Sequence, residues 1–215
     1  ARVVPDDGST YTVPRTERSV RLLDVDAATA VGGASLHLGR VEVQSQVVGY
    51  QRKDTLSSAL VGTEGLDLPV QTLPTRAIWY VVPPEVVEAA AIGTPRLAGA
   101  LHAVEHAAIG ILPLFAICDR WDVGGLSTAR HPDTGLPTIV VYDAMPGGAG
   151  VAELGFTAAD RHLAVTRESI LGCRCADGCP SCVQSPKCGN GNDHLDKEAA
   201  MRLLAAVLGL DPATR

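Results

Sequence analysis

Cysteines cluster near the carboxyl end of this chain of 215 residues. Five of the six cysteines fall between Cys173 and Cys188, and the sixth is Cys118. Four of them follow the spacing Cys-x-Cys-x3-Cys-x2-Cys, with Gly178 in the turn between the two pairs. Thiolates at this spacing can converge tetrahedrally on one Zn²⁺, about 2.3 Å from each sulfur. The pattern predicts a metal site at 173–188 rather than a disulfide framework, which would spread its cysteines more evenly.

Five cysteines compete for four ligand positions, and the spacing alone does not choose among them. Our first choice is Cys173, Cys175, Cys179 and Cys182, with Cys188 as an alternate for Cys173 or as a neighbouring thiol. An all-thiolate site leaves no open position for water, so we expect one structural Zn²⁺. An iron–sulfur cluster is the alternative occupant.

A second motif, His102, Glu105 and His106, has the H-x-x-E-H spelling of inverted zinc proteases. There, two histidines on one helix face hold Zn²⁺ and the glutamate acts as general base. Such a hydrolase needs a third ligand, and the candidates are Asp119, Asp122 and Asp143. The interpretation we favour is a buried polar cluster that fixes the helix to the loop after it. A metallohydrolase stays an alternative function.

The glycine-rich stretch from Pro146 to Gly150 lies between an expected strand and an expected helix. Backbone N–H groups at a helix start can hold an anion. The spacing matches neither common nucleotide-binding motif, so this segment is not expected to hydrolyse ATP, and a tight turn is the favoured interpretation.

Several basic residues lie near the cysteines in the sequence and could contact phosphate groups. They are Arg161, Arg167, Arg174, Lys187 and Lys197, of which Arg167, Arg174 and Lys187 are our candidates for nucleic-acid binding. A scatter of solvated charges is the alternative.

The expected secondary structure that positions these groups changes along the chain from mostly strands to mostly helices. Strands are expected over 19–26, 36–44, 47–53, 76–82 and 138–142, and helices over 84–91, 95–117, 151–171 and 194–208, with turns from 118 to 137. Thr94 is the expected N-cap of the second helix. The pattern predicts one α+β domain over 1–215: a β-rich N-terminal part (1–83) packed on a helical core (84–215), with a four-cysteine zinc knuckle between the last two helices. Trp79 and Trp121 are expected in the core.

The composition is that of an ordinary folded protein. Apolar residues make up 46% and charged residues 20% of the chain, which excludes intrinsic disorder, and the net charge of −6 argues against coating nucleic acid by bulk electrostatics. The apolar run near Ile109 is interrupted by Pro113, so no membrane span is expected. The start at Ala1-Arg2 without a leader indicates a piece of a longer protein, and the clustered thiols indicate the cytoplasm.

The motifs resemble a known family. The series runs from about Leu101 to Leu208 and comprises Leu101-His-Ala-Val-Glu-His-Ala107, Leu112-Pro-Leu-Phe115, Cys118-Asp-Arg120, Asp122-Val-Gly-Gly125, Tyr142-Asp143, Pro146-Gly-Gly-Ala-Gly150, Cys173-x-Cys175, Gly178 to Asn190 and Leu195-Asp-Lys197. It is similar to the C-terminal zinc-binding (MZB) domain of the MrfA-type DEAD/DEAH-box helicases, superfamily 2 enzymes related to the RecQ-like group. The resemblance implies that the zinc ligands are Cys173, Cys175, Cys179 and Cys182.

The resemblance also implies a function. It indicates an accessory domain of an ATP-dependent 3′-to-5′ DNA helicase in DNA repair, which guides single-stranded DNA or clamps the motor domains. Those motor domains are expected before residue 1 and would use ATP and Mg²⁺, because the 215 residues contain no Walker lysine or DEAH-type box. The fragment itself is then not catalytic. A protein-interaction module is a further alternative.

Overall fold

The computed structural model describes residues 8–212, which divide into two compact units. One unit contains residues up to 19 together with 43–72, and the other contains 20–42 and 73 onward. The long strands β1 (Thr10–Val31) and β2 (Ala34–Asp54) contribute residues to both units.

In the first unit, β3 (Leu60–Gly65) pairs antiparallel with the end of β2, from Gly49 opposite Gly65 to Lys53 opposite Leu60. The Asp54 side chain closes the turn between them by accepting hydrogen bonds from the amides of Leu56 and Ser57. The sequence predicted two short strands where β2 is continuous, and it did not predict β3.

The second unit contains the sheet order β1-β2-β4-β6-β5, with β4 at Gln71–Val81, β6 at Thr138–Asp143 and β5 at Val123–Thr128. The strand β6 is antiparallel to both neighbours, with Trp79 opposite Val140 on one side and Gly125 opposite Val141 on the other. All six residues of β6 are buried, as expected for a strand inside a sheet covered by helices.

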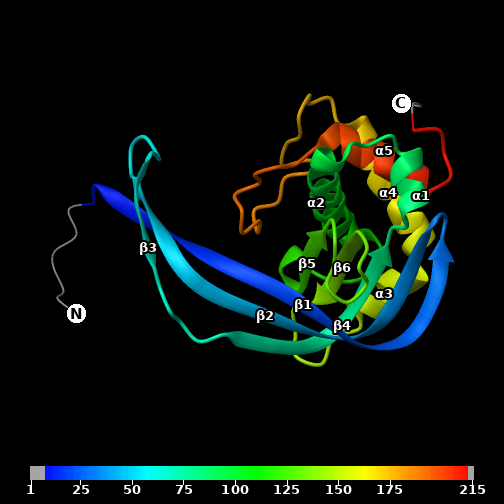
Figure 1. Cartoon of the computed structure of the whole chain (residues 1–215), viewed down its shortest axis with the longest axis horizontal. Coiled ribbons are helices and arrows are strands. Elements are labelled where there is room, and N and C mark those ends of the chain that lie inside the picture. Colours follow the sequence, from blue (N-terminus) through cyan, green and yellow to red (C-terminus); the bar gives the residue numbers. More distant parts are fainter. Residues whose placement is uncertain (1–7, 213–215) are drawn as a thin grey trace. The chain divides into compact units, whose positions relative to one another are not determined.

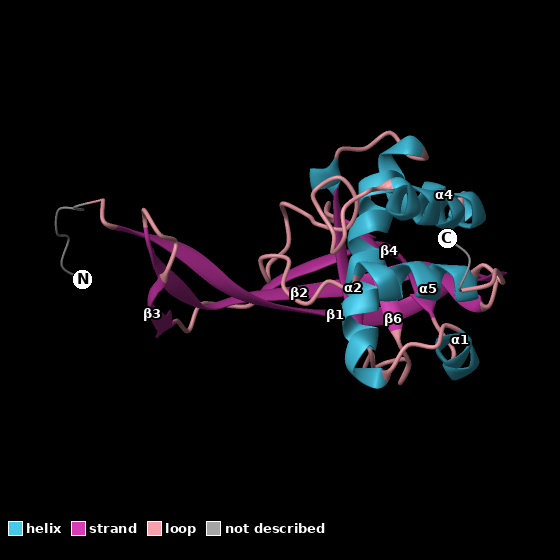
Figure 2. Ribbon diagram, turned by 90° about the horizontal axis from the view of Figure 1, so that it is seen from above, coloured by secondary structure: helices cyan, strands magenta, loops and turns pink. Residues whose placement is uncertain are grey.

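Helix α2 (Thr94–Ile111) is central to this unit. It contacts β5, β6, α4 (Ala159–Gly172) and α5 (Lys197–Val207), and every residue from Ala103 to Ile109 is buried. Figure 1 shows α2 with α4 and α5 around it, and Figure 2 shows α2 next to α5 and β6. The short helices α1 (Pro84–Ala89) and α3 (Val151–Thr157) contact α5 and β6, respectively.

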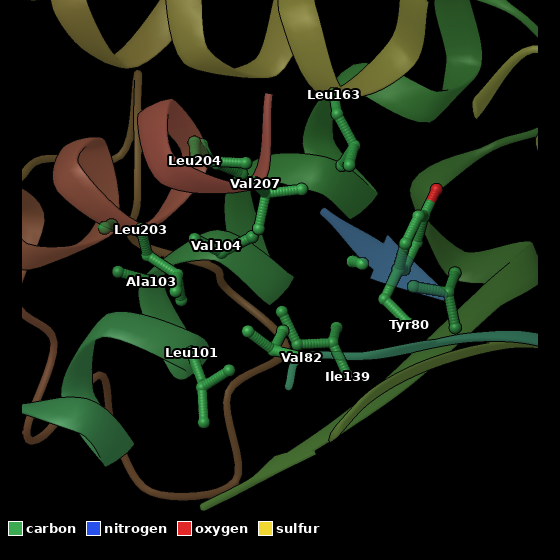
Figure 3. Close-up of a cluster of buried hydrophobic side chains, with 14 of the residues drawn as sticks. Tyr80, Val82, Leu101, Ala103, Val104, Ile139, Leu163, Leu203, Leu204 and Val207 are labelled. Carbon is green, nitrogen blue, oxygen red and sulfur yellow. The ribbon is translucent and has the colours of Figure 1, made fainter. Parts of the chain in front are cut away.

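The core of this unit is an apolar cluster between strands and helices. Figure 3 shows Tyr80, Val82 and Ile139 of the sheet region facing side chains of three helices: Leu101, Ala103, Val104, Leu163, Leu203, Leu204 and Val207. A cavity of about 20 Å³ remains next to Tyr80, Val82 and Ile139, between residues of α2, α4 and α5, and its apolar lining favours a dry void. The Tyr80 hydroxyl is buried with no hydrogen-bond partner among residues 8–212.

The predicted fold class is confirmed, because a mostly antiparallel sheet is combined with helices and the cysteines lie between α4 and α5. Several boundaries were wrong. Helix α2 ends at Ile111 and is followed by the 3₁₀ turn η1 (Leu112–Leu114), and its N-cap is Gly93 rather than Thr94. The predicted helix over 151–171 is two helices, α3 and α4, and β5 lies within the segment predicted to be turns.

By length and composition alone, the stretch Thr94–Leu114 is long and apolar enough to cross a membrane. The sequence did not predict such a stretch, because Pro113 interrupts the apolar run. Within this stretch, 67% of the most apolar 18-residue segment is buried inside the protein. That burial is expected of a core helix in a globular unit.

Candidate metal centre

The segment after α4 brings the cysteines together. Helix α4 ends at Gly172, and Cys173 takes an extended conformation that carries the chain away from the helix axis. The amides of Cys182 and Gln184 both donate to the Cys179 carbonyl and close a turn. Gly178 has φ of +113°, and a Cβ there would come within 2.5 Å of Val183 Cγ2, so glycine is required.

Four sulfur atoms converge in this turn. The Sγ atom of Cys173 lies 3.6 Å from that of Cys175 and 3.4 Å from that of Cys179. The Sγ atom of Cys182 lies 3.5 Å from Cys175 Sγ and 3.8 Å from Cys179 Sγ, and all four lie within 4.8 Å of one another. A tetrahedral Zn²⁺ with sulfurs at about 2.3 Å requires sulfur–sulfur distances of about 3.8 Å. The cluster therefore fits a closed tetrahedral zinc site.

The thiols differ in acidity. Burial opposes ionisation of Cys175, but hydrogen bonds from Cys182, Cys173 and Lys197 outweigh it and lower the pKa of Cys175 to about 6. Burial raises the pKa of Cys182 to about 12. Because four neighbouring thiolates repel one another, this donor set needs a bound cation to ionise fully.

Lys197, the first residue of α5, contacts the backbone of the cysteine segment. Its ammonium donates to the carbonyls of Cys173 and Cys175, at 2.7 Å each, and lies 3.3 Å from Cys175 Sγ. The residue is 5% exposed. Counting Lys197 among basic residues available to phosphate was therefore wrong. The only sequence signal for its role was the Leu195-Asp-Lys197 segment of the family resemblance.

The structure places Cys188 outside the four-sulfur group. Its Sγ atom lies 3.6 Å from His102 Nε2, and it forms a second cluster with His102 and His106. Burial lowers the pKa of both histidines, to about 4 for His102, so both imidazoles are neutral at pH 7.

Glu105 does not join the two histidines in this second cluster. Its Oε2 accepts a hydrogen bond from Ser127 Oγ on β5, at 2.6 Å. The three candidate aspartates are also engaged elsewhere: Asp119 and Asp122 cap the 3₁₀ turn η2 (Arg120–Asp122), and Asp143 binds backbone amides. Within residues 8–212, the H-x-x-E-H motif does not assemble the protease arrangement.

The glycine-rich stretch surrounds a carboxylate of the protein itself. Asp143 accepts hydrogen bonds from the amides of Ala149, Val151 and Ala152, at 2.5, 3.2 and 2.9 Å. The Asp143 carboxylate is therefore the anion at the start of α3, which fits the tight-turn interpretation.

The three candidate nucleic-acid residues lie in different settings. Arg174 is exposed, whereas Arg167 is half-buried on α4. Lys187 donates to the carbonyls of Arg120 and Val123, and its ammonium lies 5.1 Å from the centre of the Trp121 ring. Trp121 is 65% exposed, so the expectation that it is a core residue was wrong.

The family model of the MrfA Zn-binding domain, MZB, matches residues 104–183, which include most of α2 and all four clustered cysteines. The chain belongs to this family. It is 31% identical over 173 residues to the uncharacterised ATP-dependent helicase YprA of Bacillus subtilis, covering 80% of this chain and 23% of YprA. It is 40% identical over 111 residues to the uncharacterised protein MJ1572.1 of Methanocaldococcus jannaschii, covering 50% of this chain and 99% of that protein.

The fold is also similar to that of a solved helicase. The crystal structure of the DUF1998 helicase MrfA bound to DNA superposes with a TM-score of 0.69 and 29% identity, over 94% of this chain and 26% of the helicase chain. The MZB chain thus spans about a quarter of the length of these helicases.

Proposed function

We propose that this MZB chain is the accessory domain of an ATP-dependent 3′-to-5′ DNA helicase that acts in DNA repair. The observation that carries the proposal is the convergence of four sulfurs at tetrahedral distances inside a domain of the MrfA zinc-binding family. In this proposal Cys173, Cys175, Cys179 and Cys182 are the ligands of one structural Zn²⁺.

A structural role for the zinc follows from the donor set. Four thiolates fill a tetrahedral ion and leave no position for water or substrate. The ligands follow directly on α4, and Lys197 connects them to the first turn of α5. When bound, Zn²⁺ supplies the cross-link and the positive charge that hold this turn, and its binding free energy becomes folding free energy.

The helicase chemistry would reside in motor domains of the parent protein, which would bind ATP and Mg²⁺. This chain would contribute by clamping those domains or by guiding the separated single strand. Arg174 is the exposed candidate for phosphate contact, and the half-buried Arg167 of α4 is the second. Lys187 is engaged with two carbonyls, so its substitution perturbs folding as well as any DNA contact.

The zinc role is tested by counting zinc in purified protein prepared under reducing conditions. Cys179→Ser is expected to lose the zinc of the four-sulfur group and to melt at a lower temperature. Cys118→Ser is the control, because Cys118 lies outside both cysteine-containing clusters. A Cys179→Ser variant that kept its full zinc content and melting temperature would contradict the ligand assignment.

The DNA role is tested with a fluorescent single-stranded oligonucleotide and Arg174→Glu. Weaker binding with a shallower salt dependence is expected, because one phosphate contact is lost. The control is Arg202→Glu on α5, since Arg202 pairs with Glu198 of its own helix. Equal binding by both variants and the unaltered chain would move the DNA contact elsewhere and favour a protein-interaction module.

A further inference from the structure

Two histidines of α2 and one cysteine of the segment between α4 and α5 form a cluster separate from the four-sulfur group. One ring nitrogen each of His102 and His106 and the Sγ of Cys188 lie within 4.8 Å of one another. His102 Nε2 is 3.6 Å from Cys188 Sγ. In a tetrahedral zinc site, Zn–N of about 2.0 Å and Zn–S of about 2.3 Å place nitrogen and sulfur about 3.6 Å apart.

The histidine rings are oriented as metal ligands are. Metal-binding histidines usually donate the N–H of their other ring nitrogen to a carbonyl or carboxylate. His106 Nδ1 lies 2.9 Å from the Val183 carbonyl, which can only accept, so Nδ1 carries the hydrogen and Nε2 has a free lone pair. The His102 ring is hydrogen-bonded to the backbone of Asp193. Backbone contacts on both rings thus hold the two side chains for a shared ligand.

The fold builds this arrangement from two different segments. His102 and His106 are four residues apart and share one face of α2. Cys188 comes from the stretch between α4 and α5, which Figure 1 shows as an orange loop beside α2. Asn192 fixes the turn around Cys188, because its side chain accepts from the Ser185 amide and donates to the Ser185 carbonyl.

We propose that His102, His106 and Cys188 form a second metal site, which binds Zn²⁺ through two imidazoles and one thiolate. Imidazole and thiolate are both ligands that zinc prefers. Three protein ligands leave the fourth position to water. Glu105 is turned away to Ser127, so the site lacks the general base of a metalloprotease and its role is to fasten the 183–196 segment to α2.

The first test is the unaltered chain, which is expected to hold two zinc ions by elemental analysis. Zinc X-ray absorption should then give a mixture of sulfur at about 2.3 Å and nitrogen at about 2.0 Å, with an average of about 2.5 sulfurs per zinc. One zinc per chain with four sulfurs and no nitrogen would overturn the second site. This measurement requires no variant to fold.

Substitutions then separate the two sites. Cys188→Ala and His106→Gln should each reduce the zinc content from two ions to one and raise the sulfur average to four, whereas Glu105→Gln should keep both ions. Cys179→Ser should remove the sulfur-rich ion and leave the mixed one. Retention of two ions by Cys188→Ala and by His106→Gln would refute the second site. One zinc with mixed ligands in the unaltered chain would instead refute the four-cysteine site and leave this one standing.

Discussion

Replacing Lys197 by methionine tests whether a buried cation supports the zinc knuckle. Methionine nearly preserves the length of the side chain and removes the ammonium. The two carbonyls that accept its hydrogen bonds, those of Cys173 and Cys175, belong to the segment that carries the sulfurs. The substitution therefore removes hydrogen bonds without removing any sulfur.

The size of the effect follows from those contacts. A hydrogen bond to a charged group contributes about 1.5–3 kcal/mol. The two bonds to carbonyls are lost together with the contact to Cys175 Sγ, but the cysteine carbonyls lie in a half-buried turn where water can replace part of the interaction. We therefore expect a loss of about 3 kcal/mol of unfolding free energy, which lowers the melting temperature of a chain of this size by about 6–12 °C. Loss of a positive charge beside the thiolates should also weaken zinc binding by about 10–100-fold.

The assay combines thermal unfolding of the zinc-loaded chain with competition against a chromophoric chelator at pH 7. Arg202→Met is the matched control on the same helix, because its pair with Glu198 is exposed and contributes less than about 1 kcal/mol. A Lys197→Met variant that matched this control in both melting temperature and zinc affinity would refute the reasoning.

Four further substitutions test other parts of the second unit by urea unfolding. Asp143→Asn should cost about 2–4 kcal/mol, since three backbone amides lose a charged acceptor; an unchanged midpoint would exclude this capping role. Tyr80→Phe should be neutral or stabilise by about 1 kcal/mol, because the buried hydroxyl has no partner within residues 8–212; a large loss would reveal a hidden partner. Gly125→Ala should cost about 1–3 kcal/mol, since its Cβ would lie 2.6 Å from Glu105 Oε1; wild-type stability would contradict that close packing. Burial lowers the pKa of His162 in the folded chain. Its contribution to stability is therefore complete above the unfolded pKa of 6.5 and decreases as the pH falls below that value. His162→Gln should lose less stability than the unaltered chain between pH 7 and pH 5, and an equal loss would assign the pH dependence of stability to other groups.

The sequence predicted the features that depend on near neighbours. Cys173 to Cys182 are close in the chain, so their spacing alone indicated a metal site, and the structure brings these four sulfurs together. The buried strand β6 and the helical core were likewise predictable from apolar runs. The strand β5 could not be predicted in this way, because its residues Gly124 and Gly125 are typical of turns. Those glycines are needed where β5 passes close to Tyr142 and Glu105, a reason visible only once the strands are paired.

Residues whose roles depend on distant partners could not be assigned in the same way. Lys197 resembles a surface cation in the sequence, because nothing in its neighbourhood shows that the carbonyls of Cys173 and Cys175 lie in front of it. Asp143 is a plausible metal ligand by residue type, yet its oxygens are taken by amides six to nine residues later.

The H-x-x-E-H motif shows why a sequence pattern alone does not decide between a packing role and a metal-binding role. Helical periodicity correctly places His102 and His106 on one face, and the same periodicity brings Glu105 close to them in the sequence pattern of a protease. What decides the chemistry is the partner on each side of α2: Ser127 of β5 holds Glu105, whereas Cys188 faces the histidines. In the second site proposed above, the motif supplies two ligands and a packing residue, and the third ligand is Cys188, which the four-sulfur group leaves out. The proposed site gives one shared role to residues that the sequence treats separately: Cys188 as an alternate ligand, and the two histidines as members of a polar cluster.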